Sequence, residues 1–572
     1  MSLHRQPPSP SVPAETARIA RAAFPKGNPY LTLRDDLGPV FADKDFADLH
    51  PERGRPACPP WRLALVTLLQ FREELSDRQA AEAVRARIDW KYLLDLELGD
   101  AGFDFSLLCD FRGRLLAGSA EERLLERVLE ACRAHGLLKA RGRQRTDSTH
   151  VLAAVRKLNR LELLGETLRA ALNAIATAEP DWLRALAPPA WYERYGRRIE
   201  DLRLPKTATA REAYAGQIGD DGFQLLAALD APGAPLTLAA LPAVAALRTV
   251  WRRHFEQEGG SDSPESPGRA RLQAVRGRGG EDRLESPYDP EARYRSKDAT
   301  EWTGYMVHLT ETCDGDAPHL VVHADTTAAN VHEAMRTEPI HTALAAKGMA
   351  PATHLVDAAY ISAAHLLAAR ETLDIDLVGP PRADLSWQHR QGGAFKVTDF
   401  HIDWEANRAT CPRGKESGSW RTYQDKAGAP YIKVRFPAAD CQACEARAQC
   451  TKATGAAAGR QLRLHPRDQH EALVAARARE ASAGDRPLYA LRQGIEGTLS
   501  QAVRGFGLRC ARYRGLAKTH LQHVATAAAL DLDRVAAWLQ GRPLAPTRIS
   551  RFAALAACPS PRRYPASNIR LI

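Results

Sequence analysis

Residues 304–327, GYMVHLTETCDGDAPHLVVHADTT, predict two β-strands joined by a tight turn at GDAP. Apolar and β-branched residues fill both halves, whereas Gly, Asp and Pro gather at the bend. Another strand is predicted upstream at 143–155, RQRTDSTHVLAAV. Two more follow at 354–361, HLVDAAYI, and 374–381, DIDLVGPP, separated by the predicted helix 362–371, SAAHLLAARE. Strands and helices that alternate in this way indicate an α/β domain.

A further helix is predicted much later in the chain, within 486–507, RPLYALRQGIEGTLSQAVRGFG. The order strand, hairpin, strand, helix, strand and later helix is the ribonuclease-H-like α/β pattern. Helical sequence from Val151 to His254 and a stretch with short β-like pieces at 385–480 interrupt this order. We therefore predict an α/β, ribonuclease-H-like core interrupted by insertions and preceded by an all-helical N-terminal domain.

The region 29–140 places apolar residues at helical spacing, with a capping-box-like start, SDRQ, at 76–79, and predicts a helical DNA-binding domain. Its short helix pair from Asp77 to Trp90 is either a helix-turn-helix that reads DNA or ordinary bundle packing. Composition sets the other boundaries: a Pro-rich flexible tail at 1–28, the first part of the core with its helical insertion at 141–384, a mobile linker at 257–290 within it, a cysteine-containing subdomain at 385–480, the rest of the core at 481–540, and a basic tail at 541–572.

The charge of the chain is concentrated near its C-terminus. The 572 residues carry a net charge of +10, and from Arg486 onward thirteen Arg and one Lys face only three acidic residues. Such a segment is typical of nucleic-acid binding, although a solvated charged surface is the alternative. Ten cysteines are too sparse for a disulfide scaffold, and the sequence has neither an apolar signal core nor an uncharged apolar run of about eighteen residues. We expect a cytoplasmic protein without a membrane span.

Three acidic residues predict the catalytic site. Glu496 lies in the spacing Tyr489-x2-Arg492-x3-Glu496, which places the three side chains near one face of a helix. Asp147 and Asp357 lie in predicted strands far upstream. Carboxylates from separate elements are what two-metal phosphoryl transfer needs, because Mg²⁺ prefers carboxylate oxygens together with waters and substrate phosphate. We expect Asp147, Asp357 and Glu496 to be catalytic residues and ligands of Mg²⁺ or Mn²⁺.

Each of these residues also has a structural interpretation. Asp147 before Ser-Thr is typical of a turn, Asp357 could cap a helix, and Glu496 could be half of a surface ion pair. Acidic residues on other strands compete for the second position, namely Asp325, Asp374 and Asp376. Their places in the strand order disfavour them.

Basic and aromatic residues around the predicted helix suggest contacts to DNA. Arg492 is expected to bind a phosphate oxygen bidentately, and Tyr489 to contact the sugar–phosphate backbone. Phe506 and Tyr513 are interleaved with further basic residues that predict a groove following a DNA backbone: Arg504, Arg509, Arg512, Arg514 and Lys518.

Four cysteines in the second insertion suggest a metal site of another kind. Cys411 begins Cys-Pro-Arg-Gly, and Cys441, Cys444 and Cys450 read Cys-x2-Cys-x5-Cys. Four thiolates with this spacing suit a structural Zn²⁺ ion. The alternative is a set of reduced, unliganded cysteines.

Several long stretches are similar to one known family: TDSTHVLAAVRKLNRLELLGETLRAAL, DPEARYRSKDATEWTGYMVHLTET, HLVDAAYI and IEGTLSQAVRGFGLRCARYRGLAKTHLQHV. They resemble bacterial insertion-sequence DDE transposases of the eleven-eighty-two group. In addition, GRPACPPWRLALVTLLQFREELSDRQAAEAV resembles the N-terminal domain of InsH-type transposases. The resemblance runs from about Tyr30 to Leu539. It departs from the family's pattern at Val503, where a lysine is usual, and at Ala359, where Gly is expected.

The resemblance implies that Asp147, Asp357 and Glu496 are the catalytic triad and that Tyr489 and Arg492 complete the family signature. It implies an enzyme that binds the terminal inverted repeats of an insertion sequence, cleaves DNA with Mg²⁺ and joins the ends to target DNA as a homodimer. A non-catalytic end-binding DNA protein and a stand-alone metal-dependent nuclease remain the alternatives.

Overall fold

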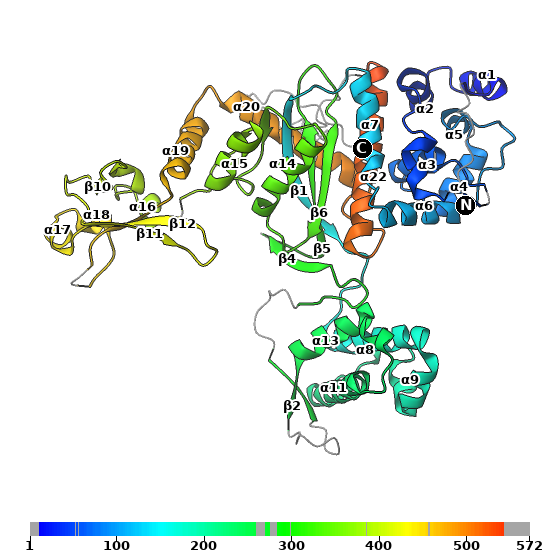
Figure 1. The fold of residues 1–572 in the computed structure, drawn as a ribbon, viewed down its shortest axis with the longest axis horizontal. Coiled ribbons are helices and arrows are strands. Elements are labelled where there is room, and N and C mark those ends of the chain that lie inside the picture. Colours follow the sequence, from blue (N-terminus) through cyan, green and yellow to red (C-terminus); the bar gives the residue numbers. More distant parts are fainter. Residues whose placement is uncertain are drawn as a thin grey trace, which may run out of the picture.

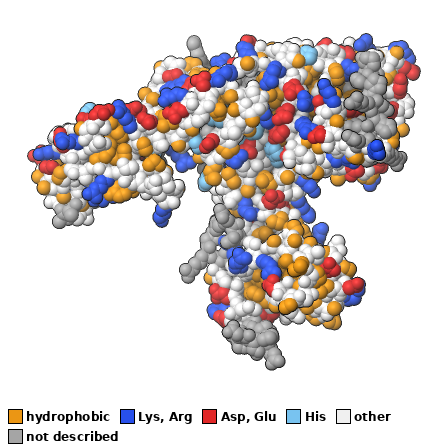
Figure 2. Space-filling model, viewed as in Figure 1, with side chains coloured by type: hydrophobic (Ala, Val, Ile, Leu, Met, Phe, Trp, Pro, Cys, Tyr) orange, Lys and Arg blue, Asp and Glu red, His pale blue; other side chains and the backbone are white. Residues whose placement is uncertain are grey.

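The computed structural model describes residues 11–51, 53–54, 56–258, 269–274, 283–297, 299–384, 386–455 and 458–542. A mixed sheet lies at the centre of the molecule, with a helical domain on one side of it (Figure 1). The two insertions project from this body as separate lobes (Figure 2). Within the described ranges, no helix is long and apolar enough to cross a membrane.

The central sheet contains the predicted hairpin and the strands on either side of it. Its members are β1 (Arg143–Leu152), β4 (Arg293–Lys297), β5 (Thr300–Thr312), β6 (Val321–Ala328), β7 (Thr353–Leu355) and β8 (Asp376–Val378). β5 pairs antiparallel with β1 and with β6, whereas β1, β7 and β8 are parallel neighbours. The order β6-β5-β1-β7-β8, with only β5 reversed among these five, is compatible with the predicted ribonuclease-H-like fold. β4 extends the sheet by pairing with the first residues of β5.

Helices cover both faces of the sheet. α14 (Thr337–Ala346) and α15 (Ala363–Leu373) lie on one side, and α22 (Leu516–Leu539) lies on the other (Figure 1). The Ala- and Leu-rich face of α22 is buried because it packs on β6 and also against the N-terminal helices α3 and α7. α22 therefore joins the core to the N-terminal domain through one continuous hydrophobic cluster.

The N-terminal domain is helical, as predicted. It contains α1 (Ala14–Ala23), α2 (Pro29–Thr32), η1 (Leu33–Leu37), η2 (Asp43–Leu49), α3 (Pro60–Arg72), α4 (Asp77–Ala86), α5 (Ile88–Leu93), α6 (Ser106–Ala117) and α7 (Arg123–Ala134). The capping box is present, since Ser76 and Gln79 exchange backbone-to-side-chain hydrogen bonds at the start of α4. Most of α5 is buried, so this helix has no free face for a DNA groove. The burial of α5 therefore favours the packing interpretation of the helix pair.

The predicted flexible tail at 1–28 is wrong for its second half. Residues 1–10 lie outside the described residues, but α1 packs on α5. Thr16 is buried and donates a hydrogen bond to the Leu96 carbonyl at 2.8 Å, while Ala20 packs near Tyr92. The Pro-rich composition obscured this short amphipathic helix.

The first insertion is a helical lobe with its own hydrophobic core. Its elements are α8 (Arg160–Ala178), α9 (Pro180–Leu186), α10 (Pro189–Tyr195), α11 (Ala208–Asp230), α12 (Leu236–Ala239), α13 (Pro242–His254), β2 (Phe255–Glu258) and β3 (Arg269–Leu272). The mobile linker predicted at 257–290 is wrong where the chain is described. β3 pairs with β2, and Asp289 is buried with its carboxylate accepting a hydrogen bond from Tyr305 at 2.6 Å.

The second insertion has a small core around Phe400, Val434 and Phe436. It contains α16 (Trp387–Arg390), β9 (His401–Asp403), β10 (Arg408–Thr410), β11 (Ser419–Gln424), β12 (Pro430–Arg435), α17 (Ala438–Gln442), α18 (Arg447–Cys450) and β13 (Gln461–Leu464). α19 (Arg467–Ala481) leads back to the body and packs on α15. Arg479 of α19 binds Asp376 of β8 through two hydrogen bonds, of 2.7 and 2.9 Å.

Candidate active site

The parallel pairing of β1 and β7 brings two of the predicted catalytic residues together. Arg145 lies opposite Leu355, so Asp147 and Asp357 follow two residues later on adjacent paths. β1 continues beyond Asp147 to Leu152, whereas β7 ends at Leu355. Asp357 therefore lies just past the end of β7, beside Asp147 in the middle of β1. This is the position at which α/β sheets usually place ligand-binding groups.

Arg492 joins all three predicted carboxylates. Its Nη2 atom lies 2.8 Å from Asp147 Oδ2 and 3.9 Å from Asp357 Oδ2, and its Nη1 atom lies 3.2 Å from Glu496 Oε1. The side chains of Arg492 and Asp147 are only 14 and 15% exposed, whereas Glu496 is 63% exposed. The three carboxylates thus surround one cation at the edge of the sheet, with Glu496 on the solvent side.

Burial dominates the electrostatics of this cluster. It raises the pKa of Asp147 to about 6, although Arg492 and the Ser148 amide lower that pKa, and Asp357 and Glu496 raise it further. For Arg492, burial opposes the charged form, but the neighbouring Asp147 and Tyr489 raise its pKa above the ordinary value. A perturbed carboxylate beside two others is a physical mark of a functional site.

The segment that carries Arg492 and Glu496 is not a single regular helix. α20 (Arg486–Ala490) contains Tyr489, the 3₁₀ turn η6 (Leu491–Gln493) contains Arg492, and α21 (Gly494–Gly505) contains Glu496. The change of helix type does not separate Arg492 from Glu496. Tyr489 packs beside Leu355 and Val378, at the ends of β7 and β8. The helical face predicted from the spacing is thus kept for Arg492 and Glu496, while Tyr489 lies against the sheet.

A contact with β1 holds the start of α21 in place. The Arg145 guanidinium donates to the Leu491 carbonyl and lies so close to Gly494 that a Cβ atom there would be 2.0 Å from Arg145 Nη1. Glycine at this position therefore permits the helix to begin directly over β1. The same contact fixes the turn from which the Arg492 side chain extends.

Glu311 anchors this arrangement from the buried side. Its carboxylate is 0% exposed and accepts hydrogen bonds from Arg145 Nε at 2.7 Å, Arg534 Nη1 at 2.8 Å and Thr498 Oγ1 at 2.5 Å. Arg145 belongs to β1, Thr498 to α21 and Arg534 to α22. This network was not predicted from the sequence. The available signal was a pair of charged residues within apolar strands, because charges are rarely buried unless they are paired.

Buried polar groups also support the two aspartates. The Tyr360 hydroxyl lies 2.7 Å from His308 Nδ1, and Ser148 also bonds to Tyr360. A second chain runs from Thr146 to His354 and then to His341, with separations of 2.7 and 2.8 Å. Residues 146, 148 and 360 neighbour the aspartates in sequence. The network therefore restricts the backbone that carries Asp147 and Asp357.

Ala359 and Val503, where the sequence departs from the family's pattern, are compatible with the arrangement of the three carboxylates around Arg492. The Ala359 amide donates to Asp357 Oδ1 at 2.9 Å, a contact that needs no glycine because Ala359 does not have a positive φ. Val503 is partly buried against the core, whereas Arg504 is exposed beside it. Of these two neighbours, Arg504 is therefore the one whose side chain faces solvent.

The aspartates that compete for the second catalytic position pair with arginines other than Arg492. Asp325 on β6 forms a bidentate pair with Arg336 at 2.7 and 3.1 Å. Asp374 pairs with Arg141, and Asp376 pairs with Arg479. Among the described residues Arg492 pairs with Asp147, Asp357 and Glu496 but with none of these competing aspartates, which favours Asp357 at the second position.

The predicted DNA-contacting residues differ in their availability. Arg504, Arg509, Arg514 and Lys518 are exposed, although Arg509 donates to Thr149 on β1 at 2.8 Å. Arg512 instead holds the N-terminal domain. Its guanidinium donates to the Leu75 carbonyl at 3.0 Å and lies over the Phe71 ring. A structural role for Arg512 is therefore the better interpretation.

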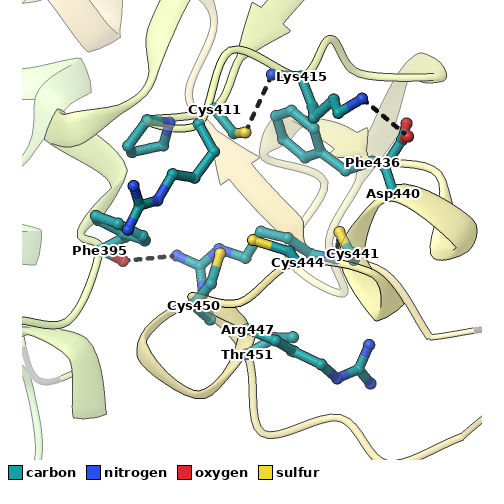
Figure 3. Close-up of a pocket in the computed structure, with 13 residues that line it drawn as sticks. Phe395, Cys411, Lys415, Phe436, Asp440, Cys441, Cys444, Arg447, Cys450 and Thr451 are labelled. Carbon is teal, nitrogen blue, oxygen red and sulfur yellow. Dashed lines mark hydrogen bonds and ion pairs between the residues drawn. The ribbon is translucent and has the colours of Figure 1, made fainter.

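The four cysteines of the second insertion line a single cavity of about 30 Å³ (Figure 3). Figure 3 shows Cys441, Cys444 and Cys450 together, with Cys411 across from them. The Lys415 amide donates to Cys411 Sγ and the Arg460 amide donates to Cys441 Sγ, each at 3.3 Å. Across the described ranges, however, no three His, Cys, Asp or Glu side chains form a ready-made metal cluster.

Two known families match separate parts of the chain. A transposase DDE domain family matches residues 410–536, and a transposase domain family, DUF772, matches residues 18–114. The first match contains Glu496 and Arg492, and the second begins within α1. Together they support the identification of the chain as an insertion-sequence DDE transposase. No curated protein and no solved structure matches the chain.

Proposed function

We propose that this transposase cleaves DNA at the terminal inverted repeats of an insertion sequence and joins the released ends to a target. In the first reaction a water oxygen attacks a phosphodiester, and a 3′-hydroxyl leaves. In the second, that hydroxyl attacks a target phosphodiester, and a target oxygen leaves. The observation that carries the proposal is the convergence of Asp147, Asp357 and Glu496 on Arg492.

The donor type suits Mg²⁺ or Mn²⁺, since three carboxylates from separate elements surround one cationic group, but they would have to close around an ion that takes the place of Arg492. When bound, the divalent metal supplies activation of the attacking oxygen and stabilisation of the leaving oxygen. Asp147, Asp357 and Glu496 are the residues that would hold it. The single positive charge of the Arg492 guanidinium partly offsets these carboxylates, and its side chain is well placed to turn to a DNA phosphate.

Other residues would position the DNA rather than react. Arg504, Arg514 and Lys518 are exposed close in sequence to α21 and can neutralise backbone phosphates. Tyr489 is half-buried beside Asp357 and is placed to contact the sugar–phosphate backbone. A homodimer that holds two DNA ends together belongs to the same proposal.

The decisive experiment is strand cleavage of a labelled duplex that carries the ends of the element. Asp147→Ala, Asp357→Ala and Glu496→Ala should each bind this duplex but lose Mg²⁺-dependent cleavage. Asp376→Asn is the matched control, because Asp376 lies on the adjacent strand β8 and pairs with Arg479 instead. The control should cleave as the wild type does.

The same assay separates the alternative functions. Binding without cleavage by the wild type would favour a non-catalytic end-binding protein. Cleavage without joined products from a 3′-hydroxyl donor would favour a nuclease. Normal cleavage by any of the three alanine variants would refute the assignment of the carboxylates.

We also propose that Cys411, Cys441, Cys444 and Cys450 hold a structural Zn²⁺ ion. The four cysteines line one cavity, and two backbone amides already point at sulfur atoms. Burial raises the pKa of the Cys450 thiol and the other three cysteines raise it further, so the four groups lie close enough to influence one another. Ligation requires the four short side chains to close around the ion.

The zinc content of the purified full-length protein tests this assignment. Wild type and Cys109→Ser should contain one zinc ion per chain, since Cys109 lies on α6 in another domain. Cys444→Ser should lose most of the metal, and Asp147→Ala should retain it. Absence of zinc from the wild type, or its retention in Cys444→Ser, would refute the site. Cobalt substitution of the wild type gives a second readout, in which sulfur-to-cobalt charge-transfer bands are expected.

A further inference from the structure

The three-stranded sheet of the second insertion has one face that its small core does not cover. Ile432 and Val434 of β12, together with Leu462 and Leu464 of β13, are buried in that core. Successive side chains of a strand point to opposite faces, so the residues between them point outward. The outward face is therefore formed by alternate residues of β11, β12 and β13.

Positive charges form a row across this outward face. Arg421 lies opposite Lys433, and Lys433 lies opposite Arg463. Arg435 adds a fourth cation further along β12. Like charges directly opposite each other destabilise a sheet, so the pattern has no structural benefit of its own. An anionic partner would turn this repulsion into attraction.

The neighbouring acidic residues do not neutralise the row. Asp425 lies 3.5 Å from Arg463, whereas Arg421, Lys433 and Arg435 form no ion pair within the part of the chain that the structure describes. These side chains are exposed or half-buried. The face therefore presents cations to solvent from a hydrogen-bonded sheet.

An aromatic pair lies next to the cationic row. Tyr423 and Tyr431 stack across the strands with ring centroids 5.7 Å apart, and the Arg463 guanidinium lies 4.0 Å from the Tyr431 ring. Tyr423 remains 39% exposed. Tyrosine hydroxyls and arginine side chains are frequent donors to phosphate and sugar oxygens.

We propose that the outward face of β11–β13 binds the sugar–phosphate backbone of double-stranded DNA. A regular polyanion matches a row of cations separated by the strand spacing of about 4.8 Å better than an isolated acidic side chain would. The lobe projects from the body and is connected through α19 to the segment that carries Arg492 and Glu496 (Figure 1). The inference rests on the proposed action on DNA and adds a contact surface outside the predicted basic segment.

Salt-dependent binding of a duplex, measured with chelator and without cleavage, tests this surface. The variant combines Arg421→Gln, Lys433→Gln and Arg463→Gln. Each lost phosphate contact should reduce the slope of log affinity against log salt by about 0.9, so the combined loss should be roughly 2–3. A control that combines Arg408→Gln, Arg467→Gln and Arg477→Gln removes the same charge from other exposed positions.

The control should keep the wild-type slope. An unchanged slope in the first variant, or an equal fall in both, would overturn the proposal. If the triple variant lost binding to polyglutamate but kept binding to DNA, the result would instead identify an acidic protein partner. If the combined variant does not fold, each single substitution should still lower the slope by about 0.9. Asp147→Ala should bind the duplex in chelator as the wild type does. A refutation of the β11–β13 surface is therefore distinguishable from a refutation of the proposed catalysis.

Discussion

Replacing Glu311 with Gln should destabilise the catalytic core strongly while leaving its shape almost unchanged. The Glu311 carboxylate is 0% exposed and receives bonds from Arg145, Thr498 and Arg534. The substitution keeps the side-chain volume but leaves two arginines, 5 and 16% exposed, without their common counter-charge. Breaking a buried ion pair by removing one partner costs about 3–5 kcal/mol.

Hydrogen exchange read by mass spectrometry reports this loss where it occurs. Amides of β1, β5 and α21 that exchange through opening of the core should exchange on the order of 10²–10³ times faster in Glu311→Gln, because each 1.4 kcal/mol is tenfold. Peptides from the helical lobe at α11 should not change.

A surface ion pair provides the matched control for this substitution. Glu82 is 62% exposed and pairs with Arg85 at 3.1 Å, so Glu82→Gln should cost no more than about 1 kcal/mol. If Glu311→Gln and Glu82→Gln alter exchange in the core equally, Glu311 does not hold α21 on the sheet. The positioning of Arg492 would then need another explanation.

The buried histidines, the ion pairs of Arg492 and the contact of Arg512 each have a measurable consequence. Burial lowers the pKa of several histidines from 6.5 to about 4 or below. Below pH 6.5 the unfolded chain therefore binds more protons than the folded chain. As a result, the free energy of unfolding should fall as the pH drops from 6.5 to 4. Thermal unfolding measured across this range should show that the free energy of unfolding falls by roughly 3 kcal/mol for each of these histidines. These histidines are His308, His323, His341 and His523. Arg492→Gln should lower the melting temperature in chelator, and Mg²⁺ should raise it more than in the wild type, because the carboxylates have lost their internal cation. Arg512→Ala should loosen the contact with Leu75 and speed limited proteolysis between the N-terminal domain and the core, whereas Arg504→Ala should weaken DNA binding without this effect.

Much of the fold was predictable because local patterns and tertiary structure agree. The hairpin around GDAP and the strands at 143–155 and 354–361 combine apolar runs with clear turn residues, and each contributes to the sheet. α1 was missed because prolines before and after it outweighed a ten-residue amphipathic pattern. β3 was missed because its residues Arg269–Leu272 have little apolar character, and its pairing with β2 comes from tertiary contact.

The contacts of the site are likewise of two kinds, those between residues close in sequence and those between residues far apart. The spacing of Arg492 and Glu496 predicted that they lie near one face of a helix, and their side chains lie 3.2 Å apart. The 2.8 Å contact between Arg492 and Asp147 joins residues 345 positions apart, and no local pattern encodes it. It depends on Arg145 and Glu311 to seat the helix on β1. In the sequence these residues appear only as charges within apolar strands, and nothing there indicates their partners. A catalytic carboxylate can thus be recognised from its neighbours in sequence, whereas the groups that set its charge and position emerge only when the strands are paired.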